Sequence, residues 1–178
     1  IIFSILILTF LMPIFIIISI VLFFLNKKVF FNSKRVGVNG KKFNLIKFST
    51  IKTKSKIASK EKFSHLGRFL RRSSLDEIPQ LFNVLIGDMS LVGPRPLPHN
   101  IEKKIPKKYR LIRRTVLPGM TGKSQLNFKG KKRSLISKVK NDIEYINGKN
   151  LVNYFKIICK TPFYILIKYK KNRLGFTL

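Results

Sequence analysis

Acidic side chains are scarce in this chain, so each of them is a candidate for chemistry. Seven Asp and Glu residues stand against 37 Lys and Arg residues. Asp76 and Glu77 are adjacent, and Asp88 follows shortly after them. One interpretation is structural, because Ser74 and Glu77 match the S-x-x-E capping box at a helix start. The other is chemical, because a carboxylate kept ionised at a helix start can act as a nucleophile.

Arginines surround this acid pair in the sequence. Three lie shortly upstream, at positions 68, 71 and 72, and Arg95 lies in the tetrapeptide G-P-R-P at 93–96. Proline fixes the local φ angle, so the Arg95 guanidinium is presented with little backbone freedom. Because arginine forks match phosphate, carboxylates among fixed arginines indicate a Mg²⁺–diphosphate site. The alternative is that Arg95 forms a structural salt bridge with Asp88 or Glu77.

The composition excludes several classes of protein. A hydrophobic content of 45% excludes a disordered basic tail, and a length of 178 residues favours one domain. Cys159 is the only cysteine, which excludes an intrachain disulfide framework and a cysteine-built zinc site. His65 and His99 are too few for a His-rich metal centre. The net charge of +30 is weak evidence for a polyanionic partner. Lys, Ile and Asn are all abundant, a pattern that the nucleotide composition of a genome can produce by itself.

The first 25 residues are the part of the sequence suited to a membrane. Residues 1–25 contain no charged side chain, and a helix of this length can cross a bilayer core. Pro13 lies near the centre and predicts a kink. Either the helix spans the membrane, or it enters and leaves on the same face as a re-entrant helix. Lys27 and Lys28 follow at once, which places this side in the cytoplasm by the positive-inside rule.

The middle of the chain alternates short elements with shaped loops. Residues 29–51 predict a hairpin, with strands at 29–31 and 43–48 and a turn at Val38-Asn39-Gly40. The polar stretch 52–64 is read as a solvated loop or short helix. Short helices are expected at 66–72 and at 78–86, the second ended by Gly87.

Loops and helices are also expected in the second half. The Pro- and Gly-rich stretches 88–98 and 116–122 are read as loops. Residues 101–115 and 135–147 have helical patterns. Residues 151–169 mix apolar and basic groups around a break at Thr161-Pro162, which suits an interfacial segment. An ordinary core helix is an equal alternative there.

One longer stretch, residues 74–97, contains both the acid pair and Arg95. It reads S-L-D-E-I-P-Q-L-F-N-V-L-I-G-D-M-S-L-V-G-P-R-P-L. It closely resembles the signature of the bacterial sugar transferase family, the small monotopic phosphoglycosyl transferases. Further stretches that resemble family motifs are R-V-G-V-N-G-K-K-F-N-L-I-K-F at 35–48, L-P-G-M-T-G at 117–122 and N-D-I-E-Y-I-N at 141–147. The resemblance covers most of residues 11–160.

The resemblance implies a fold and a location. It implies that residues 26–178 form one catalytic domain of the α/β class. This domain is mostly helical, contains a small β-hairpin or sheet and carries interfacial C-terminal helices. It also implies that residues 1–25 form a re-entrant membrane helix broken at Pro13. The expected location is the bacterial inner membrane, with the catalytic domain facing the cytoplasm.

The resemblance also implies an activity. Members transfer a phosphosugar from a UDP-sugar to a polyprenol phosphate, release UMP and use Mg²⁺, and this initiates glycan assembly. Asp76 matches the nucleophile that forms a covalent phosphosugar intermediate, and Asp76 and Glu77 match the metal-binding pair. The matching phosphate- and substrate-binding positions are Lys47, Arg71, Arg95 and Asp142. The expected partners are these two substrates and membrane lipids, and no nucleic acid.

Several positions depart from the family pattern. Ser49 replaces a basic residue, Lys123 replaces a common Trp, Phe128 replaces a Gly and Asn153 stands where Asp is common. One alternative is therefore a degenerate member retained as a scaffold. The other is a non-enzymatic, membrane-tethered basic protein that binds anionic lipid or nucleic acid. Neither the identity of the sugar nor the oligomeric state follows from the sequence.

Overall fold

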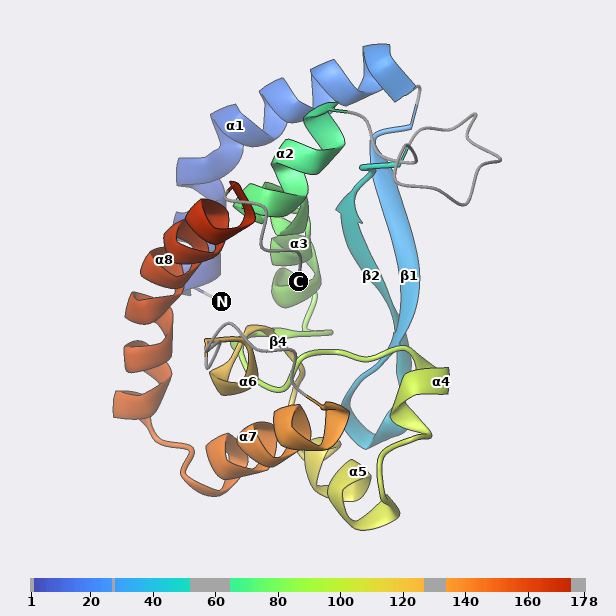
Figure 1. Cartoon of the computed structure of the whole chain (residues 1–178), viewed down its shortest axis with the longest axis vertical. Coiled ribbons are helices and arrows are strands. Elements are labelled where there is room, and N and C mark those ends of the chain that lie inside the picture. The colour runs from blue at the N-terminus through green and yellow to red at the C-terminus, as the bar shows by residue number, and fades with distance from the viewer. Residues whose placement is uncertain (1, 27, 52–64, 127–133, 174–178) are drawn as a thin grey trace.

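The computed structural model describes residues 2–26, 28–51, 65–126 and 134–173 (Figure 1). The prediction for 52–64 falls outside the described residues. Helices dominate, and two small sheets lie among them. The helices are α1 (Ile2–Asn26), α2 (His65–Ser73), α3 (Gln80–Leu85), α4 (His99–Glu102), α5 (Lys107–Arg113), α6 (Lys123–Leu126), α7 (Leu135–Asn147) and α8 (Leu151–Arg173). The strands are β1 (Phe30–Val36), β2 (Lys42–Phe48), β3 (Ser90–Val92) and β4 (Gly119–Thr121).

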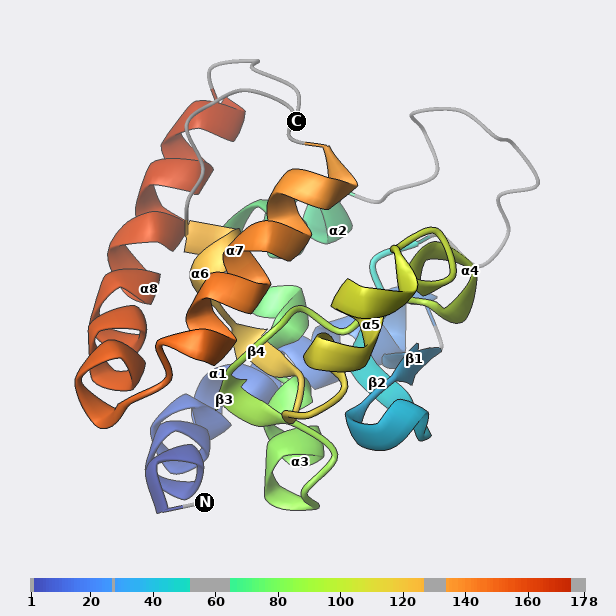
Figure 2. The ribbon, with the colours of Figure 1, turned by 90° about the horizontal axis from the view of Figure 1, so that it is seen from below.

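Helix α1 lies along the outside of the other elements and bends part-way along its length (Figures 1 and 2). It contains Pro13, which removes one helical hydrogen bond and explains such a bend. Side chains spaced three or four residues apart face the rest of the chain: Ser4, Leu8, Leu11, Phe15, Ile18 and Leu22. Most of the other side chains of α1 are exposed and apolar. Among the described residues, α1 is the one helix long and apolar enough to cross a membrane.

The predicted hairpin is confirmed, and its first strand is longer than expected. Strands β1 and β2 pair antiparallel from Phe30 opposite Phe48 to Val36 opposite Lys42. The turn residues Asn39 and Gly40 have positive φ angles of 52° and 79°. Glycine and asparagine tolerate this conformation best, which is why the turn forms at this point.

The two loop predictions are wrong in part, because each stretch contains a short strand. Strands β3 and β4 pair in parallel, and the loops beside them pack backbone against backbone. The Gly93 amide donates to the Thr121 carbonyl at 2.9 Å, and a Cβ built on Gly119 would lie 2.0 Å from the Gly93 nitrogen. Glycines are therefore required here by close approach rather than by flexibility alone. Local sequence does not reveal this pairing, because the two strands are far apart in the chain.

Most helix predictions are confirmed, with two corrections. The predicted helices 66–72, 78–86 and 135–147 appear as α2, α3 and α7, and Gly87 follows α3 with a φ of +84°. The expected helix 101–115 is instead divided into α4 and α5, because Pro106 has an extended ψ of 139° before α5.

The expected break at Pro162 is also wrong, because α8 continues through this residue (Figure 1). Thr161 makes one contact within the helix and one tertiary contact at this point. The Thr161 hydroxyl donates to the Ile157 carbonyl at 2.8 Å and lies 2.9 Å from the Thr121 hydroxyl of β4.

The core lies where α2, α3, β2 and β3 meet. Leu70, Leu81 and Met89 are almost completely buried there, and Phe48 closes it from the hairpin. Asn83 is also completely buried, although it is polar. Its side-chain amide donates to the Asn44 carbonyl at 2.8 Å, and its side-chain oxygen accepts from the Ile46 amide at 3.0 Å. Asn83 therefore fixes α3 against the edge of β2.

Candidate active site

The acid pair lies in a single turn of 3-10 helix, Leu75–Glu77, between α2 and α3. Ser74 precedes it in the left-handed conformation, with a φ of 60°, and makes no side-chain capping hydrogen bond to this turn. The capping-box interpretation is therefore wrong, and the Glu77 carboxylate is engaged elsewhere. Asp76 is 7% exposed, so the acid pair sits at the edge of the core rather than on an open surface.

Two cations from different elements converge on Glu77. Lys47 of β2 places Nζ 2.6 Å from Glu77 Oε1, and an Arg95 guanidinium nitrogen lies 3.1 Å from the same oxygen. Burial acts to raise the pKa of Glu77, but the charges of Arg95 and Lys47 outweigh it and lower this pKa to about 2. Glu77 therefore stays ionised at any physiological pH. The Asn83 bridge between α3 and β2 explains why Lys47 reaches this site.

Arg95 joins the cluster from the G-P-R-P loop after β3. The charge of Glu77 raises the pKa of Arg95, and Asp76 and Tyr164 of α8 act in the same direction. Of the two structural partners considered from the sequence, Glu77 forms the salt bridge, and no ion pair with Asp88 is present among the described residues. The Arg95 side chain is still 47% exposed. It can therefore reach a ligand outside the protein.

Asp142 does not touch this cluster directly. Its Oδ2 accepts from Nε of Arg113 at 3.0 Å, and the side chains of Asp142 and Arg113 are only 4% and 6% exposed. A terminal nitrogen of Arg113 also donates to the backbone carbonyl of Arg95 at 2.7 Å. Burial raises the pKa of Asp142, although the Arg113 charge acts to lower it. Asp142 is thus connected to the acid pair indirectly, through Arg113 and then Arg95.

Arg71 occupies the last turn of α2, with an exposed side chain, shortly before the turn that holds the acid pair. The two ion pairs of Glu77 run to Lys47 and Arg95. The structure thus brings together four predicted site residues, namely Lys47, Asp76, Glu77 and Arg95. A role for Arg71 or Asp142 in binding substrate stays a prediction.

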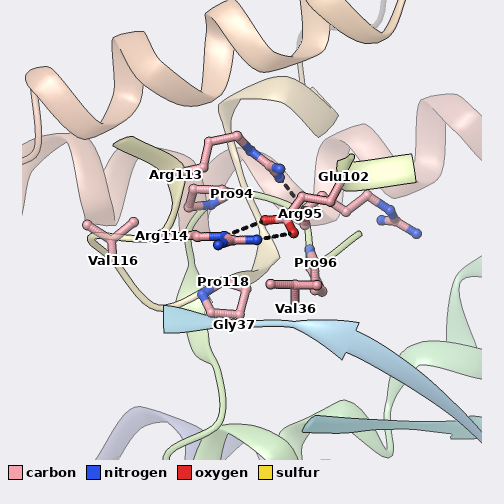
Figure 3. A pocket seen from close by; sticks show the side chains of 10 residues that line it. All are labelled: Val36, Gly37, Pro94, Arg95, Pro96, Glu102, Arg113, Arg114, Val116 and Pro118. Atoms are coloured by element: carbon pink, nitrogen blue, oxygen red, sulfur yellow. Dashed lines mark hydrogen bonds and ion pairs between the residues drawn. The ribbon is translucent and has the colours of Figure 1, made fainter. Parts of the chain in front are cut away.

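Arg113 is the functional candidate that sequence reasoning missed, and Arg114 is its neighbour in the chain. Figure 3 shows both approaching the G-P-R-P loop, with Arg114 paired to Glu102 and Arg113 bonded to Arg95. Together they line a cavity of about 10 Å³, while the Arg95 side chain extends away from it (Figure 3). The sequence contained one signal that could have pointed to Arg113. Acids are scarce, and a buried carboxylate needs a cationic partner, so each acid predicts a basic residue beside it.

The acid pair can accommodate a divalent ion only with help from a ligand. The described residues contain no group of three His, Cys, Asp or Glu side chains placed to hold a metal. Magnesium is commonly bound by one or two carboxylates together with water and substrate phosphate. Asp76 and Glu77 fit that pattern, because both contacts of Glu77 with cations are made at Oε1.

A larger cavity of about 310 Å³ lies between α6, α7 and α8. Its lining includes Lys123, Lys156 and Lys160, and Lys123 pairs with Glu144. Neither residue of the acid pair lines it. The cavity is therefore separate from the cluster around Glu77.

Comparison with known proteins gives consistent matches. The family model described as bacterial sugar transferase matches residues 1–168. Over 152 residues the chain is 38% identical to a UDP-glucose:undecaprenyl-phosphate glucose-1-phosphate transferase of Xanthomonas campestris pv. campestris, covering 78% of this chain and 31% of that protein. Over 158 residues it is 37% identical to the uncharacterized sugar transferase EpsL of Bacillus subtilis, covering 84% and 76%. An undecaprenyl-phosphate galactose phosphotransferase of Salmonella typhimurium is 34% identical, with coverage of 76% and 33%.

The matches cover most of this chain but different shares of the relatives. The chain spans about a third of the Xanthomonas and Salmonella proteins and about three-quarters of EpsL. The family model covers nearly the whole chain, including both the acid pair and the G-P-R-P loop. With the acid pair, its two cations and these matches in agreement, the chain belongs to the bacterial sugar transferase family.

Proposed function

We propose that this chain transfers a phosphosugar from a UDP-sugar to a polyprenol phosphate and releases UMP. The observation that carries the proposal is the convergence of Lys47 and Arg95 on the adjacent carboxylates Asp76 and Glu77. The names of the Xanthomonas and Salmonella relatives, which are sugar-phosphate transferases acting on undecaprenyl phosphate, support it. A site with fixed cations beside a carboxylate is suited to phosphoryl chemistry.

In the first step, a carboxylate oxygen of Asp76 attacks the β-phosphorus of the UDP-sugar. The bond from that phosphorus to the bridging oxygen breaks, and UMP leaves with the electron pair. The product is a phosphosugar joined to Asp76 as an acyl phosphate. Arg95 and Lys47 bind the phosphate oxygens, where preorganised donors stabilise developing negative charge.

In the second step, a phosphate oxygen of the lipid attacks the same phosphorus. The bond to Asp76 breaks and the free carboxylate is restored. Glu77 stays ionised throughout, because its pKa is about 2. Its role is to hold Lys47 and Arg95 in place until the diphosphate competes for them. Arg71 is proposed to bind phosphate, and Asp142 is proposed to support substrate binding.

Magnesium is the cofactor we propose for this site. Asp76 and Glu77 are the residues that would hold it, and the bound ion would offset the charge of the diphosphate. Its requirement is tested by turnover in the presence of a chelator, followed by restoration with added Mg²⁺.

We also propose that α1 is re-entrant, with the catalytic part on the cytoplasmic face of the bacterial inner membrane. Phe3 stacks edge-on against Phe155 of α8 at 5.5 Å, and Phe15 packs against Phe48 and Phe82 at 5.1 and 5.6 Å between ring centres. Both parts of α1 thus contact the same body, and this supports the re-entrant arrangement over a straight span. The exposed apolar residues of α8, such as Phe163 and Leu166, suit contact with the membrane interface.

The decisive experiment is a UMP-release assay with polyprenol phosphate and a panel of UDP-sugars. Release that depends on both substrates supports the transferase. No release from any UDP-sugar would favour the alternatives, a degenerate scaffold or a basic membrane-tethered protein. The panel also identifies the sugar.

Topology is tested by cysteine labelling. A single cysteine placed ahead of Phe3 in a Cys159→Ser background should react only with reagents that reach the cytoplasm. Labelling from the periplasmic side would contradict the re-entrant proposal and favour a straight span.

A further inference from the structure

The G-P-R-P loop has an unusual shortage of backbone donors. Pro94 and Pro96 have no N–H group, so Arg95 carries the one backbone amide of residues 94–96. Beyond the Gly93 amide, which donates to the Thr121 carbonyl, the loop is anchored through carbonyl oxygens. Pro94 accepts from the Gly119 amide at 2.9 Å, Leu97 accepts from the Val36 amide at 3.1 Å, and Arg95 accepts from the Arg113 side chain at 2.7 Å.

These three anchors differ in kind. The donors to Pro94 and Leu97 are backbone amides, so neither bond uses a side chain, although position 119 must be glycine because of its close approach to Gly93. The donor to Arg95 is a side chain, and it holds the carbonyl of the residue whose guanidinium meets Glu77. The position of this peptide therefore depends on the identity of residue 113.

Arg113 is itself fixed by Asp142. The Nε atom lies 3.0 Å from Asp142 Oδ2, and both side chains are almost completely buried. One nitrogen of the guanidinium thus donates to a carboxylate of α7, while another nitrogen donates to the loop. Only a planar group with several donors can make both contacts at once.

Stability alone does not explain this arrangement. A buried ion pair often stabilises no more than apolar side chains of the same volume would. The neighbouring pair provides a direct comparison, since Arg114 binds Glu102 through two hydrogen bonds of 3.1 and 2.8 Å and approaches Gly40 in the hairpin turn. Arg114 joins structural elements to one another, whereas Arg113 joins α7 to the loop of the site.

We propose that Arg113, held by Asp142, is a positioning residue that fixes the Arg95 peptide and thereby aims the Arg95 guanidinium at the phosphate. This inference rests on the proposed function and assigns Asp142 a role through Arg113 rather than direct contact with substrate. Movement of the Arg95 peptide carries its side chain with it, because the flanking prolines leave little other freedom.

The test is a double-mutant cycle between positions 113 and 95, measured on the full chain in lipid nanodiscs. Arg113→Lys keeps the charge beside Asp142 but lacks the fork that reaches the Arg95 carbonyl. We expect it to lower kcat and kcat/KM on the order of tenfold when Arg95 is present. In an Arg95→Lys background, the same change should cost less than about twofold, because the guanidinium that it positions is gone.

Arg114→Lys is the matched control. It changes the adjacent arginine of another, partly buried ion pair and should lower the melting temperature without coupling to position 95. Equal losses for Arg113→Lys in both backgrounds would overturn the proposal and leave Arg113 as a structural residue. If Arg113→Lys does not fold, Asp142→Asn replaces it in the cycle, with the same coupling expected and the same outcome decisive.

A second readout separates this inference from the proposed function. If the wild-type chain releases no UMP from any UDP-sugar, the proposed function fails, and the cycle is then measured on the affinity for inorganic pyrophosphate. Coupling between positions 113 and 95 in that affinity would uphold the positioning role. Additive losses, or no pyrophosphate binding by the wild type, would overturn it.

Discussion

Glu77 and Asp142 are both carboxylates that face arginine, yet their environments have opposite effects. Glu77 receives two cations on one oxygen, and its pKa falls to about 2. Asp142 has Arg113 as its salt-bridge partner in a nearly closed setting, and burial raises its pKa. The charges of Arg113 and Arg95 both act to lower the pKa of Asp142, but burial outweighs them there, so the balance between burial and nearby charge decides the outcome rather than the residue type.

The difference separates a reactive region from a supporting one. Around Glu77, two cations and two carboxylates lie together, and the cluster remains accessible through the half-exposed Arg95. Around Asp142, the ion pair with Arg113 is enclosed. Its consequence for the site is that Arg113 holds the Arg95 carbonyl in place. Changes in the first region should affect chemistry, and changes in the second should affect position and stability.

The largest effect is expected at Asp76, beside Glu77. Asp76→Asn removes the nucleophile, because an amide cannot form the acyl phosphate. We expect turnover to fall on the order of 10⁴-fold, with covalent labelling by the donor sugar lost. UMP release and mass spectrometry of the intact chain measure both.

Asp88→Asn is the control for this change. Asp88 lies after α3 and is not part of the cluster around Glu77. Its turnover should stay within about twofold of wild type. Substantial turnover by the Asp76→Asn variant would show that the reactive region lies elsewhere.

Arg95→Lys is expected to have the next largest effect. Lysine keeps the charge near Glu77 but lacks the planar fork, so bidentate contact with phosphate is lost. We expect kcat and kcat/KM to fall together by roughly ten- to a thousandfold, by comparison with removal of one preorganised donor. The melting temperature, measured on the same preparation, should change little. Unchanged turnover with a lower melting temperature would make Arg95 a structural residue.

Glu77→Gln sharpens the comparison through pH. The folded pKa of about 2 lies below the ordinary value of 4.5, so ionised Glu77 stabilises the fold above pH 4.5. This contribution is lost as pH falls toward 2, and its upper limit is roughly 3 kcal/mol before screening by solvent. Chemical unfolding of wild type and variant between pH 6 and pH 2 should give a difference that shrinks with acidity. A difference independent of pH would contradict the assigned ion pairs.

Asp142→Asn should show the smallest pH effect, and with the opposite sign. A folded pKa above the ordinary value of 3.8 means that the folded state binds the proton more tightly than the unfolded state. The stability of the wild type relative to the variant should therefore decrease as pH rises through the interval between these two pKa values. The same unfolding series measures it. A slope like that of Glu77 would mean that Arg113 outweighs burial at this site.

Local elements of the fold were predictable because their signals are local. The turn at Asn39-Gly40, the end of α3 at Gly87 and the helix at Leu135–Asn147 each follow from residues that lie close together in the chain. The expected break at Pro162 failed because contacts with distant residues, such as Thr121, hold α8 through it.

The candidate site was predictable only in its contiguous parts. The acid pair and the G-P-R-P loop belong to one stretch, 74–97, and both could be assigned from it. The capping interpretation of Ser74 and Glu77 failed, because Glu77 finds stronger partners outside its own turn. Arg113 was missed because nothing in its own neighbourhood distinguishes it from the other basic residues.

By itself, the sequence determined an apolar first segment, the short elements that follow it and the acid pair with its nearby arginine. Periodicity, turn residues and composition act over a few residues, so these features can be read from neighbouring positions. Tertiary structure alone decided which cation meets which carboxylate. Lys47 reaches Glu77 from 30 residues away, and Arg113 reaches Asp142 across 29. These pairs form where Asn83 fixes α3 to β2 and where α5 packs against α7, and such long-range packing leaves no mark on local sequence patterns.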